Sequence, residues 1–284
     1  MIQFSRTQKQ FIDNGAAKRN RLQRLARKAA NLSINSDTRH MYIYSPAGLG
    51  KTHSVKQAMT ESGIPHYEIS GSQSMFAFGI GLATIQFLNQ GAQKIVMVVD
   101  DCDEILKNST NVNIMKNVLA GANKYSYEKS LQNQMSGLTD IQVAALDHFS
   151  SPEKMGFEVP THNMVFVFTS NFKLPTDDAW EVEKQKGSNK AIMYGHLNAI
   201  RSRCHTSDFE LESNEKWGWI ADCVLNEDVV NLTDEDKIIL LDWMFNNWDR
   251  LRERSIRTVQ KMSETMIEDP TGYRDDWEID YLDY

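Results

Sequence analysis

Two runs of the sequence are apolar at nearly every position, and they constrain the fold more than any other feature. The runs are KIVMVVD (94–100) and MVFVFTS (164–170). A strand that alternates apolar and polar residues has one solvated face, whereas a continuous apolar run is typical of a strand covered on both faces. The two runs therefore predict a parallel sheet with helices on both sides.

Further strands and helices alternate around these two runs, which is the pattern of an α/β fold. The other predicted strands are 40–44, 66–70 and a short one at 208–211. Helices are predicted over 51–62, 83–90, 105–124 and 139–149, and the rest of 125–162 is irregular. After about residue 213 the strand pattern stops, and the helical pattern that follows predicts a small all-α domain.

The two ends of the chain have opposite charge. The first 30 residues contain eight Lys or Arg and one Asp, although the whole chain has a net charge of −7. Residues 15–32 place apolar side chains at helical spacing among these basic residues, which predicts an amphipathic helix. The last 17 residues contain seven acids and one Arg. These ends are either contact surfaces for different partners or solvated termini.

Cysteine usage and hydropathy indicate the compartment. The three cysteines, Cys102, Cys204 and Cys223, contain no C-x-x-C pair, which argues against a disulfide framework and against a zinc site. No apolar run approaches the roughly 20 residues that span a bilayer. The polar N-terminus, MIQFSRTQKQF, lacks the apolar segment of a signal peptide. We therefore expect a cytoplasmic protein with no membrane partner.

The segment MYIYSPAGLGKTHSV (41–55) places a turn of small residues between a strand and a helix that begins with Lys-Thr. It nearly matches the phosphate-binding pattern G-x-x-x-x-G-K-[ST], with Ser45 in place of the first glycine. Gly48 and Gly50 let backbone N–H groups approach phosphates. Lys51 is predicted to contact the β- and γ-phosphates, and the Thr52 hydroxyl to bind Mg²⁺. The Ser45 position requires a small residue more than it requires positive φ.

Two of the predicted strands end in polar side chains that suit nucleotide chemistry. Asp100 ends the first apolar run, where a carboxylate can coordinate Mg²⁺ beside the loop. Asp101 follows at the position of a general base for water, but it is shorter by one CH₂ than the glutamate that is common there. Asn171 follows the second run, and its amide can hold both water and a phosphate oxygen.

Three arginines follow in the second half of the chain. Arg201 and Arg203 precede the last predicted strand, where they can reach the phosphates of a neighbouring copy or simply lie at the surface. Arg257 lies on a predicted helix that can face the nucleotide.

The order of these segments resembles the AAA+ ATPase family over roughly residues 36–265. SPAGLGKT resembles the Walker A motif, VMVVDD the Walker B motif, FTSN the sensor 1 segment and RSIRT the sensor 2 segment. IRSRC is similar to the arginine-finger segment, especially in clamp-loader subunits. The resemblance implies binding of ATP and Mg²⁺, a homo-oligomeric ring, usually a hexamer, and hydrolysis between subunits.

On this basis the predicted fold is an AAA+ module, an αβα sandwich followed by an all-α lid. The expected parts are a basic N-terminal helical extension (1–35), the αβα domain (36–213), a helical lid (214–265) and an acidic aromatic tail (266–284). The cofactor-binding residues are Ser45, Pro46, Ala47, Gly48, Leu49, Gly50, Lys51, Thr52, His53 and Arg257. The metal ligands are Thr52 and Asp100, and the catalytic residues are Asp101, Asn171, Arg201 and Arg203. Two departures from the family pattern are Ser45 and Asp101, and the second bears on the rate of hydrolysis more than on binding.

The macromolecule on which such a motor acts is less constrained. Phe76, Phe78 and Gly79, with Gly81, resemble a pore loop that grips a threaded protein, although both phenylalanines could instead be core residues. The basic helix at 15–32 could instead bind DNA, but the remainder of the chain is acidic, which weakens that binding. A nucleotide-switched scaffold with slow turnover is the third alternative.

The aromatic residues of the acidic tail predict a docking peptide for a basic partner. They are Tyr273, Trp277, Tyr281 and Tyr284.

Overall fold

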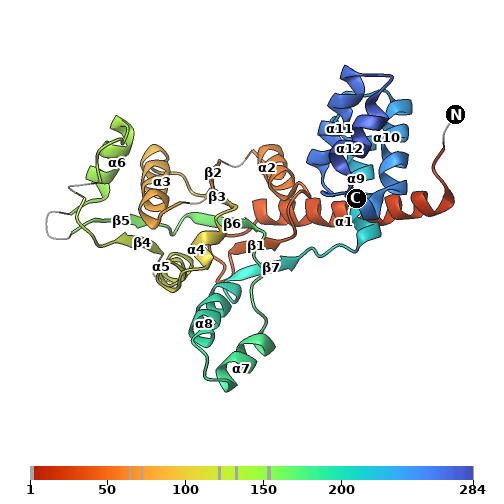
Figure 1. Cartoon of the computed structure of the whole chain (residues 1–284). Helices are drawn as coiled ribbons and strands as arrows, with labels where there is room; N and C mark the ends of the chain where they lie inside the picture. Colours follow the sequence, from red (N-terminus) through yellow and green to blue (C-terminus); the bar gives the residue numbers. More distant parts are fainter. Residues whose placement is uncertain are drawn as a thin grey trace. The chain divides into compact units, whose positions relative to one another are not determined.

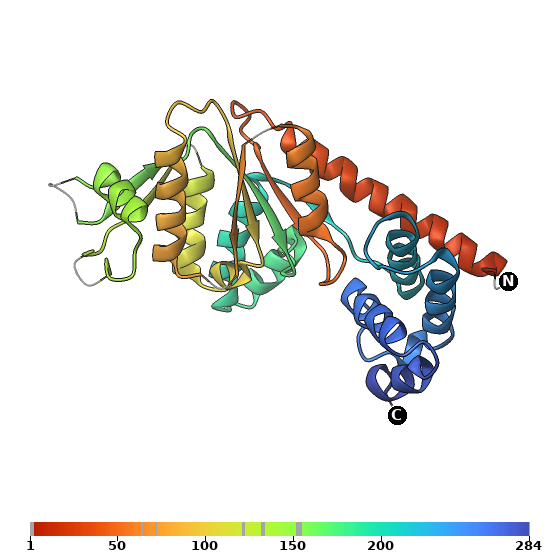
Figure 2. The same cartoon turned by 90° about the horizontal axis from the view of Figure 1, so that it is seen from above.

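The structure is a computed structural model that describes residues 3–63, 65–71, 73–120, 123–131, 134–151 and 155–283. The chain divides into two compact units. The sheet unit consists of Ala26–Ser45 and Val55–Asp208, and the helical unit of Met1–Leu25, Pro46–Ser54 and Phe209–Tyr284. Figures 1 and 2 show the elements of both units, coloured along the sequence.

The sheet unit is built on five parallel strands in the order β2-β3-β6-β1-β7. These are β1 (His40–Tyr44), β2 (His66–Ser70), β3 (Ile95–Asp100), β6 (Met164–Ser170) and β7 (Cys204–Asp208). Its helices are α3 (Met75–Leu88), α4 (Asp103–Leu106), α5 (Ser109–Leu119), α6 (Asp140–Phe149), α7 (Asp177–Gln185) and α8 (Lys190–Arg201). Helix α2 (Lys51–Glu61) begins in the helical unit and ends in the sheet unit. The predicted α/β class is confirmed.

Continuous burial explains why the strand predictions succeed. Every residue of β6 is buried, as are the first five of the six residues of β3. The predicted strands at 40–44, 66–70 and 164–170 match β1, β2 and β6 residue for residue. The prediction at 208–211 is wrong: β7 lies at the edge of the sheet, over Cys204–Asp208, and its sequence CHTSD has almost no apolar signal.

A second, two-stranded sheet lies within the segment predicted to be irregular. It pairs β4 (Lys124–Tyr127) with β5 (Phe157–Pro160) in antiparallel fashion. Aromatic side chains stabilise this small sheet: the rings of Tyr125 and Phe157 are 5.8 Å apart between centroids, and both residues are buried.

The helical unit contains most of α1 and the helices of the C-terminal part of the chain. They are α1 (Arg6–Ala30), α9 (Ser213–Asn226), α10 (Asp234–Asn246), the 3₁₀-helix η1 (Trp248–Arg250), α11 (Ile256–Glu268) and α12 (Tyr273–Tyr281). Trp217, Trp248 and Trp277 lie in one apolar core with residues of α9, α10 and α11. Among the described residues after 213 no strand occurs, which confirms the predicted change to helices.

The expected acidic tail is folded into this core. Residues 273–281 form α12, and the Trp277 side chain is fully buried, with its Nε1–H donating to the Met262 carbonyl at 3.0 Å. The Tyr273 and Trp277 rings pack at 4.6 Å between centroids. The docking-peptide prediction is therefore wrong for Trp277, because a buried side chain offers no contact surface. Tyr284 lies outside the described residues.

The expected N-terminal extension is also part of the fold. Helix α1 begins at Arg6, nine residues before the predicted start, and its residues up to Leu25 belong to the helical unit. Phe4, Phe11 and Ile12 pack against the tryptophan-containing core. The segment predicted as a helical extension over 1–35 is thus mostly a helix, and its first part completes this core.

Glycines let α1 and α9 approach closely. A Cβ atom added to Gly15 would lie 2.1 Å from the Gly218 carbonyl carbon, and one added to Gly218 would lie 1.8 Å from the Phe11 carbonyl oxygen. Real Cβ atoms do not approach backbone this closely, so the two helices touch main chain to main chain.

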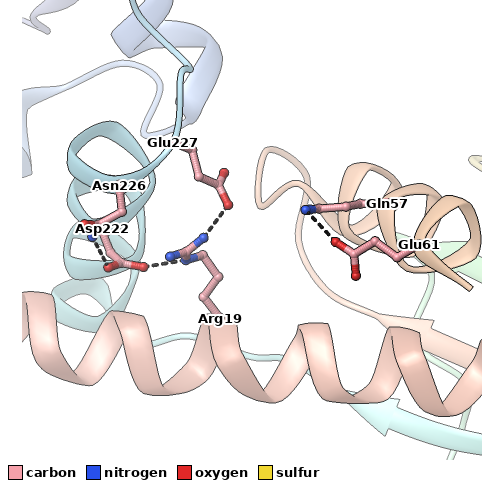
Figure 3. A network of polar contacts seen from close by, with 6 residues as sticks. All are labelled: Arg19, Gln57, Glu61, Asp222, Asn226 and Glu227. Carbon is pink, nitrogen blue, oxygen red and sulfur yellow. Dashed lines mark hydrogen bonds and ion pairs between the residues drawn. The ribbon is translucent and has the colours of Figure 1, made fainter.

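An ion-pair network holds α1 to α9 (Figure 3). The Arg19 guanidinium donates from Nε to Asp222 and from Nη1 to Glu227. Asn226 donates to the other oxygen of Asp222 at 2.8 Å. The side chains of Arg19 and Asp222 are 13% and 5% exposed, so this pair is largely withdrawn from water.

Replacing Arg19 with alanine is expected to lower the free energy of unfolding by about 3 kcal/mol, because it leaves the Asp222 carboxylate buried without its cation. Urea denaturation measures the loss. The exposed Arg24 on the same helix is the control, and its alanine variant is expected to change stability by less than about 0.5 kcal/mol. Equal losses for the two variants would contradict this account.

Among the described residues, no helix is both long enough and apolar enough to cross a membrane.

Candidate nucleotide site

The phosphate-binding loop has the backbone conformation that its glycines predict. Gly48 and Gly50 have φ of +82° and +68°, and α2 begins directly afterwards at Lys51. Ser45 is not among the non-glycine residues with positive φ, which in the described part of the chain are Asp101 and Asn123. Ser45 is buried, and its N–H donates to the Ser170 carbonyl at 3.2 Å. The glycine that the common pattern has at this position is therefore not required by the backbone.

The lysine of the loop is held close to it. The Lys51 side chain is 7% exposed, and its Nζ donates to the Pro46 carbonyl at 3.2 Å. Thr52 is half-buried in the first turn of α2, whereas His53 is exposed. Leu49 anchors the loop in the interior and is 2% exposed, and Ala47 is exposed. An ammonium group and the amino end of a helix are thus both present where a phosphate is expected.

Within the helical unit the loop lies against the start of α11. A Cβ added to Gly48 would lie 2.8 Å from the Ser255 Cβ. Ser255 is the N-cap of α11, and its Oγ accepts from the Thr258 N–H at 3.2 Å. Arg257 is exposed, two residues after this cap. The structure therefore brings the helix of the predicted sensor 2 arginine next to the phosphate-binding loop.

The predicted acidic residues lie at the carboxyl edge of the parallel sheet. Asp100 ends β3 and pairs in register with Thr169 of β6, whose hydroxyl donates to the Asp100 carboxylate at 2.5 Å. The Asp101 N–H donates to the Thr169 carbonyl at 3.2 Å. The pairing of β3 with β6 thus fixes both acids at the same edge as Asn171.

Asp101 and Asn171 contact each other directly. The Asn171 amide donates from Nδ2 to the Asp101 carboxylate at 2.7 Å. Asp101 has φ of +49°, a left-handed conformation that is uncommon outside glycine and that clusters at functional sites. The predicted base and the predicted sensor amide therefore form one polar pair at the carboxyl edge.

A third acid, which sequence reasoning missed, orients this pair. Asp103 accepts from the Ser170 hydroxyl at 2.5 Å and from the Asn171 N–H at 3.2 Å. The carboxylate thus bridges the end of β6 to the start of α4. Its signal in the sequence is the third acid of the segment DDCD, directly after the two predicted site acids.

Cys102 lies between these acids, but it does not supply a reactive thiolate. Burial, followed by the charge of Asp100, raises the pKa of its thiol to about 12. A thiol with this pKa stays protonated at neutral pH.

The residues present fit a magnesium ion bound mainly through phosphates. Among the described residues, no group of three or more His, Cys, Asp or Glu side chains is arranged to hold a metal. Mg²⁺ commonly needs only one or two protein ligands, together with water and phosphate oxygens. The Thr52 hydroxyl and the half-buried Asp100 carboxylate are donors of that kind.

The predicted finger arginines lie at the other edge of the sheet. Arg201 is the last residue of α8 and forms an ion pair with Asp177 at 3.5 Å. Arg203 directly precedes β7, and its Nη1 donates to the Ala199 carbonyl at 2.5 Å. Because all five strands are parallel, Arg203 lies at the amino edge, away from Asp101 and Asn171. These arginines are not brought together with the acids of their own copy.

The pore-loop residues are not in a loop. Phe76, Phe78 and Gly79 lie in α3, and Phe78 is fully buried. A Cβ added to Gly79 would lie 2.3 Å from the Tyr125 ring, so this glycine serves close packing. The Phe76 ring packs 5.1 Å from the Tyr127 ring between centroids. The predicted glycine-hinged loop is therefore wrong, and the alternative of core residues holds.

Comparison with known proteins agrees with this geometry. Residues 41–177 match the family model described as "ATPase family associated with various cellular activities (AAA)". The matched segment contains the phosphate-binding loop, Asp100, Asp101 and Asn171. The chain is also 25% identical over 260 residues to the "Uncharacterized 36.7 kDa protein in nrdC-mobD intergenic region" of Enterobacteria phage T4. That alignment covers 85% of this chain and 68% of the phage protein.

Proposed function

We propose that this protein is an ATPase of the AAA family that binds ATP with Mg²⁺ and hydrolyses it, because residues 41–177 match the model of that family. The observation that supports hydrolysis is the contact between Asp101 and Asn171 at the carboxyl edge of the sheet. A carboxylate and an amide that touch can share one water molecule, the first accepting its proton and the second orienting it.

Each remaining residue then has a defined role. The N–H groups of the loop and Lys51 bind the phosphates, and Arg257 adds positive charge from α11. Thr52 and Asp100 would hold Mg²⁺, which neutralises charge on the phosphate oxygens when bound. Asp103 is a positioning residue, because it contacts Asn171 and Ser170 rather than the nucleotide.

Substituting Asp101 by asparagine tests the proposal. We expect kcat for ATP hydrolysis to fall at least about 100-fold, because asparagine cannot accept the proton, while ATP affinity changes little. Phosphate release and ATP titration calorimetry measure the two quantities. Glu104→Gln is the matched control, since Glu104 lies in the same acidic segment but forms an ion pair with the exposed Lys107. Unchanged turnover in Asp101→Asn would contradict a catalytic role.

We further propose that hydrolysis is completed between copies of the chain in a ring, with six as the expected number. The position of Arg203 supports this arrangement, because Arg203 lies at the amino edge, away from the acids of its own sheet, and would have to act on the nucleotide of another copy. Work on a protein substrate is still part of the proposal, although Phe76 and Phe78 no longer supply the grip. Binding of DNA is less favoured, because Lys18 and Arg19 of the basic helix are already paired with acids.

The slow nucleotide-switched scaffold is the second candidate, and one contact favours it. The short Asp101 side chain is held by Asn171, so its carboxylate stays close to the sheet edge. Under this proposal the site hydrolyses ATP slowly and spends most of its time with bound nucleotide. Under this proposal Asp101→Asn leaves assembly intact.

A further inference from the structure

A cavity opens at the amino edge of the sheet unit, away from the acids of the nucleotide site. Its volume is about 420 Å³. It is lined by the segment 34–39, by the end of α5 and by the turn between α8 and β7. Ser36, Arg39, Asn123, Ser202 and Arg203 contribute polar side chains to it. Its polar lining includes two guanidinium groups, so it is suited to an anion.

Strand register explains why the two arginines lie together. β1 and β7 are parallel neighbours, and His40 pairs with Cys204. Arg39 and Arg203 are the residues immediately before this pair. They therefore lie side by side at the amino ends of two adjacent strands.

Arg39 is buried, yet its charge is not compensated. The residue is 9% exposed and donates to the Ile34 and Thr161 carbonyls at 3.1 Å and 3.5 Å and to the Asn123 side chain, all of which are neutral acceptors. Its Nε is buried without a hydrogen-bond partner. Burial lowers the pKa of the Arg39 guanidinium, as expected for a cation away from water.

Ion pairs do not neutralise the cavity. Within the described part of the chain, neither Arg39 nor Arg203 forms an ion pair, and neither pairs with Asp37, which also lines the cavity and is exposed. Buried charges in proteins are ordinarily paired, because an isolated one is expensive to remove from water. An anion between the two guanidinium groups would supply the missing charge.

We propose that the cavity between Arg39 and Arg203 binds a phosphate group. Guanidinium groups match phosphate oxygens in planar, bidentate geometry, and the hydroxyl groups of Ser36 and Ser202 supply further donors. The phosphate group is that of a small free ligand, which would lie at the sheet edge opposite the acids of the nucleotide site.

The experiment titrates inorganic phosphate into the Lys51→Ala variant. This substitution removes phosphate binding at the phosphate-binding loop, so that only binding elsewhere is measured. Calorimetry at constant ionic strength is expected to show saturable binding. Arg203→Gln and Arg39→Lys, each added to Lys51→Ala, are expected to weaken it about tenfold. Arg201→Gln is the matched control, because Arg201 pairs with Asp177 and does not line the cavity. Circular dichroism verifies that each variant is folded. If Arg39→Lys does not fold, Arg203→Gln alone tests the proposal, because Arg203 is half-exposed.

Binding of inorganic phosphate that depends on Arg39 or Arg203 supports the proposal. If no binding is seen, or if both substitutions leave it unchanged, the proposal is overturned. ATP hydrolysis by the wild-type protein, measured in a separate assay, shows whether the ATPase function holds.

Discussion

Replacing Lys51 with alanine is expected to weaken ATP binding by about 100-fold or more. The Lys51 ammonium group lies against the phosphate-binding loop. Hydrogen bonds between charged groups each contribute about 1.5–3 kcal/mol. Loss of two such bonds to the phosphates corresponds to this factor. Titration calorimetry with ATP and Mg²⁺ measures the change. The effect is expected on affinity itself, because the lysine contacts the bound phosphates before any bond is broken.

Lys56 provides the matched control for this substitution. It lies one turn further along α2 and forms an ion pair with Glu68. Lys56→Ala is expected to leave ATP affinity within about twofold of the wild type. ATP binding by Lys51→Ala at wild-type strength would show that the loop, despite its conformation, is not the nucleotide site.

Substitution of Gly218 by alanine is expected to cost more than about 4 kcal/mol of unfolding free energy. The added methyl group would lie 1.8 Å from the Phe11 carbonyl oxygen and 2.4 Å from its carbon. Both atoms belong to the backbone of α1, so no side chain can rotate away. Helices α1 and α9 would have to separate, which would open the apolar core around Trp217. Thermal and urea denaturation measure the loss.

Gly195 in α8 serves as the comparison. A Cβ there would lie 3.4 Å or more from its nearest neighbours, which are atoms of the Trp180 side chain. Gly195→Ala is therefore expected to change stability by less than about 1 kcal/mol, with a small gain from helix propensity. If both alanine variants are equally stable, the close approach of α1 and α9 does not exist in solution.

The sequence predicts the sheet well because its central strands are buried on both faces. In β3 and β6 the apolar run and the strand coincide almost completely. The same pattern misleads in α3, whose sequence MFAFGIGLATIQFL is apolar around much of its circumference. Its glycines predict a loop, but they serve close packing. Gly79 makes room for Tyr125, and a Cβ added to Gly81 would lie 3.3 Å from the Ile69 side chain. Contacts with distant segments explain why glycine stands at these two positions of α3, and the local sequence pattern carries no information about such contacts.

The charged ends of the chain show the same limit. Acidic composition predicts a solvated tail, but Trp277 finds the Met262 carbonyl and a buried site beside Trp243. Arg19 reads as part of a basic surface until Asp222 and Glu227 approach it from α9. In both cases the partner is distant in sequence, so composition alone overestimates the exposed charge.

The motifs of the candidate site could be read locally, whereas their contacts could not. Lys51, Asp100 and Asn171 each follow or end a strand, and this is visible in the sequence. The hydrogen bond between Asn171 and Asp101 depends on the pairing of β3 with β6, and the role of Asp103 depends on the chain reversing after Asp101. Arg39 had no motif at all, because its neighbour Arg203 is distant in sequence and close only through the pairing of β1 with β7.

The contact between Gly48 and Ser255 has a mechanical consequence. The Gly48 backbone faces the Cβ of Ser255 with no room for even one further carbon atom between them. Ser255 caps α11, so a change in the backbone at Gly48 would press directly on the start of that helix.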